Sequence, residues 1–369
     1  MARRRAEHHP PLPRGAEVIR ANAHLLDLLG KTPVAYIDTP LPHGHGGFWA
    51  KLECLSAGGM KARSAVAMLL AARARGELRP GAAVVESTSG TLGVGLAFAC
   101  QALGHPVVLV VDAELEPSMR ALLHAHGARL EVVDHPHETG GWQRARLDRL
   151  RAVRRELPGA FWPDQYNNPD NPAGYATLAR ELVEQLDRVD VLVCSVGTGG
   201  HSAGIIETLR THWPHVRLVG VDTIGSTIFG QPARARVMRG LGSSIYPRNV
   251  AYDQFDEVHW VGPVEVVDAC RRLARDCFVT GGWSTGAVAL VSAWVARVEA
   301  GAVVATVFPD GPHRYLGTIF DDGFCRDRGL FGQAADRPVE IGHAESVEVT
   351  GWARCQSVTV PSARLAVPA

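Results

Sequence analysis

The hydrophobic pattern of this chain alternates short apolar runs with longer amphipathic stretches between residues 32 and 308. Apolar runs of about four to eight residues are typical of buried strands, whereas longer periodic stretches are typical of helices. We predict strands over 32–38, 48–53, 82–86, 106–111, 130–133, 189–196, 216–222, 258–261 and 303–308. One predicted helix begins at Lys61, another ends near Leu103, and the others cover 116–126, 142–157, 173–186, 202–211, 263–277 and 287–298.

Strands that alternate with helices predict parallel sheets with helices on both faces. Two doubly wound α/β units are the economical interpretation of this order. Ligands of open parallel sheets lie beyond the carboxyl ends of the strands, and glycine-rich loops are expected there at 87–93, 197–201 and 281–286. After residue 330 the pattern changes. Segments 339–341 and 346–349 alternate like edge strands, and their sequence does not indicate a function.

Composition and charge argue against several classes of protein. The 38 basic and 38 acidic residues balance, which argues against a nucleic-acid-binding protein, since such a protein would show a basic surface. No apolar run reaches the roughly 18 residues of a membrane span, and residues 1–17 are predicted to be a flexible tail without a signal peptide. The seven scattered cysteines predict neither a metal site nor a disulfide framework, and they favour a cytoplasmic location.

Lysine is rare in this chain, which has only Lys31, Lys51 and Lys61 among its 38 basic residues. Arginine cannot replace lysine in imine chemistry, because its guanidinium group stays protonated. Lys61 follows two glycines and precedes a run of small and apolar residues, so we expect a tight loop that places it at a helix start. An ordinary solvated lysine at a helix N-terminus is the alternative, and this segment alone does not separate the two.

Two other loops carry groups that suit anions. Gly197-Thr198-Gly199-Gly200 lies between a predicted strand and a predicted helix, where backbone N–H groups can hold a phosphate. Ser87-Thr88-Ser89-Gly90 also precedes a helix, and its donors suit a carboxylate. Taken singly, the first could be a tight turn and the second a helix N-cap. Together with a lysine amine, they are what a pyridoxal-phosphate enzyme acting on an amino acid requires.

Seven short segments occur in the order of one known family over about residues 24–320. They are LGKTP at 29–33, GGMKAR at 58–63, TSGTLG at 88–93, DQYNNPDNP at 164–172, GTGGH at 197–201, GWSTGA at 282–287 and PDGPHRYL at 309–316. This ordered set resembles the cysteine synthase and cystathionine β-synthase family, the fold-type-II pyridoxal-phosphate enzymes. No single motif is specific, but the set is.

The resemblance implies a fold like that of the tryptophan synthase β-subunit, with the active site in a cleft between two domains. A smaller α/β domain over 54–164 would carry the substrate loop, and a larger domain over 18–53 and 165–330 would bind the cofactor. Residues 331–369 would be an extension. The resemblance also implies a homodimer.

Roles follow for individual residues. Lys61 would hold pyridoxal 5′-phosphate as a Schiff base and move the substrate's Cα proton. The cofactor would also be contacted by Thr91 at its 3′-oxygen, by Ser284 at its pyridine nitrogen and, at its phosphate, by Gly197, Thr198, Gly199, Gly200 and His201. The neutral hydroxyl of Ser284 suits elimination and replacement at Cβ more than transamination. The substrate would be bound by Thr88, Ser89, Gly90, Leu92 and Gln165.

Four positions depart from the family pattern. Thr91 stands where the family has Asn, Leu92 replaces Thr, Gly59 replaces Ser, and His201 replaces Thr. These changes suggest a specialised paralogue with its own donor or nucleophile. Arginines 236, 239 and 248 flank the Gly240–Ser244 segment, which borders the active-site entrance in the family. An arginine there could bind a phosphate or carboxylate of the second substrate, or simply lie on the surface.

The leading hypothesis is β-replacement on serine or on O-phospho- or O-acetylserine through an aminoacrylate. A small nucleophile would then add to the β-carbon. Sulfide would give cysteine, a thiol would give a thioether, and an amine would give a diaminopropionate-type product. The same residues could instead carry out β-elimination to a keto acid and ammonia. A hypothesis of another class is a regulatory protein that keeps the fold without catalysis. A Rossmann dehydrogenase is less favoured, because no dinucleotide fingerprint follows any strand.

Overall fold

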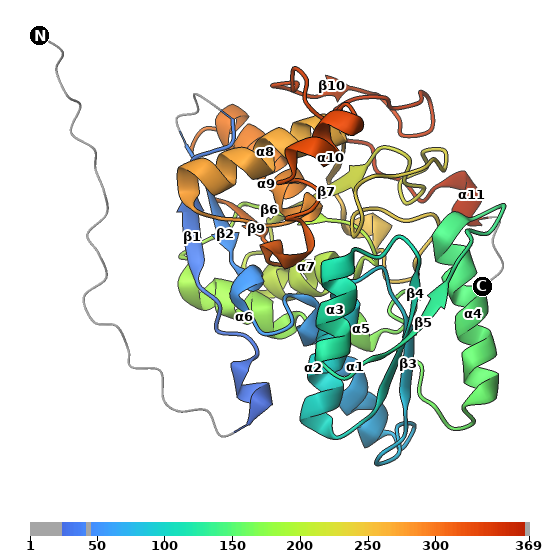
Figure 1. Ribbon diagram of the computed structural model, residues 1–369. Helices are drawn as coiled ribbons and strands as arrows, with labels where there is room; N and C mark the ends of the chain where they lie inside the picture. The colour runs from blue at the N-terminus through green and yellow to red at the C-terminus, as the bar shows by residue number, and fades with distance from the viewer. Residues whose placement is uncertain (1–23, 42–45, 366–369) are drawn as a thin grey trace, which may run out of the picture.

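Two sheets of unequal size organise the protein, as a computed structural model of residues 24–41 and 46–365 shows (Figure 1). The larger sheet has the strand order β1-β2-β9-β6-β7-β8-β11-β10, and the smaller has the order β3-β4-β5. The strands are β1 (Val34–Ile37), β2 (Phe48–Lys51), β3 (Val84–Ser87), β4 (Val107–Asp112), β5 (Arg129–Val133), β6 (Val191–Ser195), β7 (Arg217–Thr223), β8 (Glu257–Val261), β9 (Val304–Val307), β10 (Val339–Glu340) and β11 (Ala353–Cys355). The tail predicted at 1–17 lies outside the described residues.

The central strands are parallel and buried on both faces. Strands β2, β9, β6, β7 and β8 run parallel, and only β1 and β11 pair antiparallel with their neighbours β2 and β8. Successive residues of β6 point to opposite faces, so Val193 packs in one core cluster and Leu192 in the other. The predicted doubly wound α/β fold is thus confirmed for a sheet covered on both sides.

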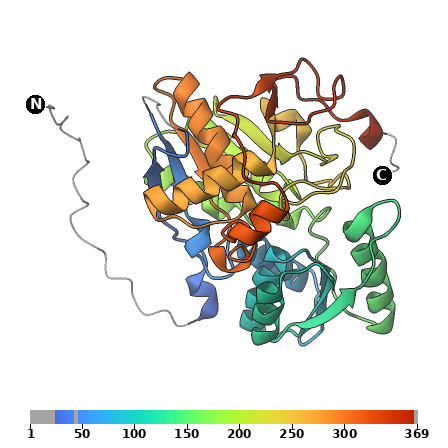
Figure 2. The same cartoon turned by 45° about the horizontal axis from the view of Figure 1, so that its top comes forward.

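The helices divide between the two sheets (Figures 1 and 2). Around the smaller sheet lie α1 (Lys61–Ala74), α2 (Thr91–Leu103), α3 (Pro117–Ala125) and α4 (Gly141–Glu156). The remaining helices are α5 (Asp170–Ala173), α6 (Ala176–Gln185), α7 (Gly200–His212), α8 (Pro263–Cys277), α9 (Trp283–Val298), α10 (Asp322–Asp327) and α11 (Ser362–Leu365). Short 3₁₀ turns cover η1 (Leu25–Leu28), η2 (Glu53–Leu55), η3 (Tyr252–Gln254) and η4 (Pro312–Arg314).

Three helices begin earlier than their sequences predict. Helix α2 starts at Thr91, α7 at Gly200 and α9 at Trp283, so parts of three predicted glycine-rich loops are helical. In each case a glycine immediately precedes the helix, and Gly199 adopts the left-handed conformation (φ +81°) that glycine tolerates best. As a result, residues predicted in loops occupy first helical turns, close to the partial positive charge of the helix N-terminus.

The C-terminal extension adds two short strands to the edge of the larger sheet. Strand β11 pairs with β8, and β10 pairs with β11. The edge strand predicted at 346–349 is wrong, because the Val349 N–H donates to the side chain of Gln231 (2.8 Å) instead of joining a ladder. Gln231 also donates to the carbonyls of Ala344 and Val347. The extension therefore packs against Gln231.

A buried hydrogen-bonded chain anchors this extension. Trp352 donates through Nε1 to His259 Nδ1 (3.0 Å), and His259 Nε2 lies 2.6 Å from Glu257 Oε1. Burial lowers the pKa of His259, although Glu257 opposes the shift. We expect Trp352→Phe to lower the free energy of unfolding by about 1–3 kcal/mol, because it leaves a buried imidazole nitrogen without its donor. Urea denaturation measures this, with exposed Val347→Ala as the control. A midpoint equal to wild type would contradict the prediction.

Candidate active site

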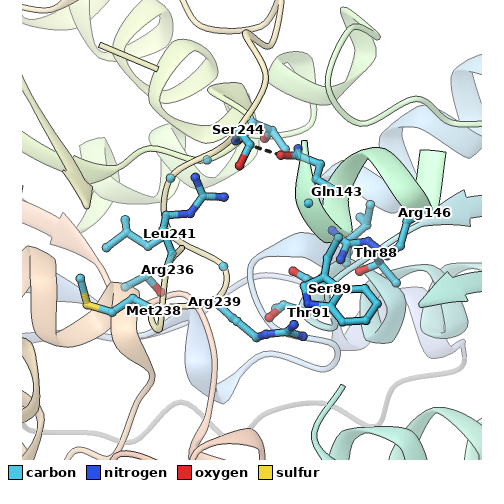
Figure 3. A pocket seen from close by; sticks show the side chains of 18 of the residues that line it. Thr88, Ser89, Thr91, Gln143, Arg146, Arg236, Met238, Arg239, Leu241 and Ser244 are labelled. Atoms are coloured by element: carbon cyan, nitrogen blue, oxygen red, sulfur yellow. Dashed lines mark hydrogen bonds between the residues drawn. The ribbon is translucent and has the colours of Figure 1, made fainter. Parts of the chain in front are cut away.

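One large cavity, with a volume of about 790 Å³, gathers most of the predicted site residues. It is of the size that small-molecule sites usually have. Figure 3 shows Thr88, Ser89 and Thr91 on one side of this cavity and Arg236, Leu241 and Ser244 on the other. The predicted residues that line it are Lys61, Thr88, Ser89, Thr91, Leu92, Gln165, Gly197, Thr198, His201 and Ser284.

Three predicted site residues, Gly90, Gly199 and Gly200, shape the walls without lining the cavity. A Cβ atom at Gly199 would lie 2.6 Å from the backbone of Asn249, and one at Gly200 would lie 2.2 Å from the side chain of Asn171. Gly90 packs on the Arg314 guanidinium in the same way. Each of these glycines allows a close approach that a side chain would prevent.

The three lysines lie in different environments. Lys31 is exposed, and Lys51 is buried in a salt bridge with Glu181 (2.7 Å). Lys61 begins α1 and lines the cavity, and its amine forms no hydrogen bond with any described residue. Of these three amines, only that of Lys61 is therefore available to a ligand in the cavity.

The loop before Lys61 is tight, as predicted. Gly58 and Gly59 have φ values of +72° and +65°, which side chains rarely adopt. The Met60 N–H donates to the Pro309 carbonyl (2.8 Å), and a Cβ atom at Gly59 would lie 3.0 Å from the same oxygen. The serine that the family has at this position would be strained here, so Gly59 fits this chain's own backbone.

The environment of Lys61 also changes its charge. Burial lowers the pKa of its amine from 10.5 to about 8, and the carboxylate of Asp310 partly opposes this shift. An appreciable fraction of the amine is consequently neutral near pH 8, as a nucleophile or a proton acceptor must be.

The Gly197–His201 loop offers a set of unused donors. The N–H groups of Gly197, Thr198 and Gly199 donate to no described residue, and the loop continues into the N-terminus of α7. Such converging N–H groups at a helix start bind phosphate. Burial, with a smaller contribution from Lys61, lowers the pKa of His201 to about 3. His201 is therefore neutral in this loop, and its ring packs edge-on against Tyr175.

A second network surrounds Thr91, and the sequence did not indicate it. Thr91 Oγ1 donates to Asp310 Oδ2 (3.0 Å) and accepts from Arg314 Nη1 (3.3 Å). Tyr315 Oη donates to the same carboxylate oxygen at 2.7 Å, while the buried Asp310 Oδ1 has no partner among the described residues. Asp310, Arg314 and Tyr315 lie in the 309–316 motif. This motif was the sequence signal that could have pointed to the network. The predicted contact of Thr91 with a cofactor oxygen stays a prediction.

Gln165 is held in place by the strand that precedes the Thr88 loop. Its backbone N–H donates to Glu86 Oε2 (3.1 Å), and its side chain donates to the Ser87 carbonyl (2.9 Å). Burial raises the pKa of Glu86 to about 7, although hydrogen bonds from Ser87, Trp162 and Gln165 oppose the shift. Gln165 lines the cavity, and its side-chain oxygen accepts no hydrogen bond from a described residue.

Four arginines line the cavity, and only part of this group was predicted. Arg146 comes from α4, whereas Arg234, Arg236 and Arg239 come from the segment 233–244. Arg239 bonds Asp112 (2.9 Å) and Glu114 (2.7 Å), and Arg146 also bonds Asp112. The third arginine of the sequence prediction, Arg248, is not among the lining residues.

Comparison with known proteins places this site in a family. Residues 25–310 match the family model described as "Pyridoxal-phosphate dependent enzyme". The chain belongs to this family. Two curated relatives are each named N-(2-amino-2-carboxyethyl)-L-glutamate synthase. The one from Cupriavidus metallidurans is 37% identical over 310 residues, 81% of this chain and 90% of that one. The one from Ralstonia nicotianae is 34% identical over 302 residues, 81% of this chain and 89% of that one.

The solved structures agree with this assignment. The O-acetylserine dependent cystathionine β-synthase from Helicobacter pylori superposes with a TM-score of 0.75 at 28% identity, over 81% of this chain and 99% of that one. The protein is therefore a pyridoxal-phosphate-dependent enzyme of fold type II and of the cysteine synthase type. The hypothesis of a regulatory protein without catalysis is not supported.

The residues of the cavity fit pyridoxal 5′-phosphate. Lys61 provides an amine without a hydrogen-bond partner, and the Gly197–Gly199 amides provide unused donors for a phosphate. The Ser284 hydroxyl lines the cavity on the first turn of α9 and forms no hydrogen bond with a described residue. It could therefore accept a hydrogen bond from the pyridine nitrogen or donate one to it. These individual roles, the homodimer and the cytoplasmic location stay predictions. No helix in the described ranges is long and apolar enough to cross a membrane.

The lowered pKa of Lys61 gives a testable pH dependence. We expect the rate of cofactor uptake by cofactor-free protein to rise about tenfold per pH unit below pH 8 and to level off above it, because only the neutral amine reacts. Absorbance after re-addition of pyridoxal 5′-phosphate, between pH 6 and pH 11, measures this rate. If the rate continues to rise up to pH 10.5, the ordinary pKa of lysine, the pKa of Lys61 is not lowered.

Proposed function

We propose that this enzyme replaces the β-substituent of an O-activated serine, O-phosphoserine or O-acetylserine, with the amine nitrogen of an acidic amino acid. The product would be an N-(2-amino-2-carboxyethyl) amino acid. The observation that carries the proposal is the set of four arginines that line the cavity, one of which, Arg236, has no carboxylate partner among the described residues. Sulfide has no group that would pair with an unpartnered guanidinium group, whereas an acidic amino acid carries carboxylates that suit it.

The names of the two relatives support the same reaction. In an N-(2-amino-2-carboxyethyl)-L-glutamate, the nitrogen of glutamate is joined to the β-carbon of an alanine unit, and this linkage is what replacement at Cβ by an amine produces. Each relative matches 81% of this chain. The replacement of the family's Asn and Thr by Thr91 and Leu92 is consistent with a donor or nucleophile other than those of cysteine synthesis.

The described side chains can perform the necessary proton transfers. When bound, pyridoxal 5′-phosphate supplies an electron sink for negative charge at Cα. Lys61, with a pKa of about 8, can accept the Cα proton and return it to the same carbon later. Thr88 and Ser89 line the cavity, and their hydroxyl groups would donate hydrogen bonds to the carboxylate of the donor. The Cβ–O bond breaks with its electron pair on the leaving group, and the amine forms the Cβ–N bond and releases one proton.

Steady-state kinetics with a panel of donors and nucleophiles tests this function. The holoenzyme is incubated with O-phosphoserine or O-acetylserine and with L-glutamate, L-aspartate or sulfide, and the products are separated. We expect an N-linked product with at least one acidic amino acid and a kcat/KM for it well above that for sulfide. Formation of keto acid and ammonia under every condition would show elimination, and turnover with sulfide alone would show cysteine synthesis.

A further inference from the structure

We propose that Arg236 binds the side-chain carboxylate of the incoming nucleophile and thereby selects an acidic amino acid over a neutral one. The inference rests on the proposed function and names the residue that would determine the second substrate. It starts from a difference among the four arginines that line the cavity. Three of them have carboxylate partners within the protein, and Arg236 has none among the described residues.

The partners of the other three arginines are all identified. Arg146 and Arg239 share Asp112, and Arg239 also bonds Glu114. Arg234 pairs with Glu348 of the C-terminal extension. Arg236 makes one hydrogen bond, from Nη1 to the carbonyl of Gly225 at 3.2 Å. Three arginines are thus neutralised locally, and the fourth leaves its other guanidinium donors unused.

A partly buried cation without a counter-ion is unfavourable unless a ligand supplies the charge. Burial lowers the pKa of Arg236, and the charges of Asp222 and, to a smaller extent, Tyr166 oppose this shift. Asp222 is a poor counter-ion, because burial raises its own pKa to about 7 and its Oδ2 has no partner. Its Oδ1 accepts from the Thr223 N–H instead (2.8 Å). An anion in the cavity would satisfy Arg236 better than any group of the protein does.

The position of Arg236 suits the distal end of a second substrate. Figure 3 shows it across the cavity from Thr88 and Ser89, which are predicted to hold the donor. Ser244 lies on the same segment. The Ser244 N–H donates to Gln143 Oε1 of α4 (2.9 Å), which fixes this wall against the smaller sheet's helices. Ser244 also lines the cavity with a hydroxyl that forms no hydrogen bond with a described residue.

The charge and shape of this site favour a carboxylate over a phosphate. A guanidinium group presents two parallel N–H donors that match the two oxygens of a carboxylate. Only one uncompensated positive charge is present here, which balances a monoanion, whereas a phosphate ester carries about two negative charges at neutral pH. The leaving group of O-phosphoserine is the other possible source of an anion, and kinetics with two substrates separates the two sources.

The test compares Arg236→Gln and Arg236→Lys with wild-type holoenzyme. We expect Arg236→Gln to raise the KM for L-glutamate by about 10- to 100-fold, since a hydrogen-bonded charge pair is lost. The KM for the donor and the kcat/KM with sulfide should stay within about twofold of wild type. Arg236→Lys should recover part of the affinity for glutamate, because it restores the positive charge but not the two parallel N–H donors of a guanidinium group. Arg234→Gln is the matched control, since it removes the same charge from a paired arginine of the same segment.

Two results would overturn the proposal. One is a raised KM for the donor with an unchanged KM for L-glutamate, which would assign Arg236 to the leaving group. The other is unchanged kinetics for both substrates in a variant that keeps the wild-type melting temperature and cofactor absorbance. If wild-type enzyme forms no N-linked product with any acidic amino acid, the proposed function itself fails. Normal glutamate use by Arg236→Gln would instead refute only the role of Arg236.

Discussion

Replacing Lys61 with alanine should abolish turnover, with a loss of at least about 1,000-fold in kcat, because the variant lacks both the amine that holds the cofactor and the base at Cα. This is the largest effect that we expect from a single substitution. Lys61 is the lysine that lines the cavity, and burial lowers the pKa of its amine to about 8. The absorbance of the bound cofactor should also change, since no other lysine can take its place.

The control for this experiment is Lys31→Ala, which removes an exposed lysine from outside the cavity. It should retain the activity and the absorbance of wild type. Lys51 is unsuitable as a control, because its amine is buried and paired with Glu181, so its loss would affect stability. A Lys61→Ala variant with wild-type activity and spectrum would refute the assignment of the catalytic lysine.

Arg63→Met should lower the free energy of unfolding by about 3–5 kcal/mol, the usual effect of removing one member of a buried ion pair. Arg63 is 3% exposed on α1, two residues after Lys61. Its guanidinium group donates to Glu53 at 2.7 and 2.8 Å and to Glu181 at 2.8 and 3.0 Å. Burial would raise the pKa of Glu181, but hydrogen bonds from Arg63 and Lys51 lower it to about 2.

The loss of Arg63 would leave the buried carboxylate of Glu53 without its cation. Because Glu53 follows β2 and Arg63 is on α1, the pair also joins the larger sheet to the helix that carries Lys61. Arg75→Met is the matched control, since Arg75 pairs with Glu77 at the surface near the end of the same helix. Its denaturation midpoint should stay close to wild type. Equal stability losses in the two variants would contradict a special role for the buried pair.

Local sequence signals predicted the parts of the site that lie within one segment. The glycines before Lys61, the Thr88–Leu92 loop and the Gly197–His201 loop each combine a strand, a turn and a helix start that are close in sequence. Parallel-sheet geometry then places such loops at one edge, and the structure brings ten of the thirteen predicted residues to one cavity. Helix starts were the weakest boundaries, because Thr91, Gly200 and Trp283 each follow a glycine that can equally belong to a loop or a cap.

The remainder of the site depends on contacts between distant segments. Asp112 pairs with Arg146 and Arg239, which are 34 and 127 residues away in the chain, and Asp310 accepts from Thr91 across 219 residues. Hydrophobic periodicity carries no information about such partners. The predicted role of an arginine beside 240–244 could therefore not be narrowed to Arg236 until the ion pairs of its neighbours were known. The extension after residue 330 was similarly unassigned, because its packing on Gln231 is equally distant in sequence.

The most direct test of the central claim follows a labelled nitrogen atom. Holoenzyme is incubated with O-phosphoserine or O-acetylserine and L-[¹⁵N]glutamate, and the product is analysed by mass spectrometry and NMR. β-Replacement by the amine predicts one product in which ¹⁵N is bonded to the β-carbon of an alanine unit, with little keto acid formed. A keto acid with unlabelled ammonia, and no carbon bonded to ¹⁵N other than that of glutamate, would contradict it.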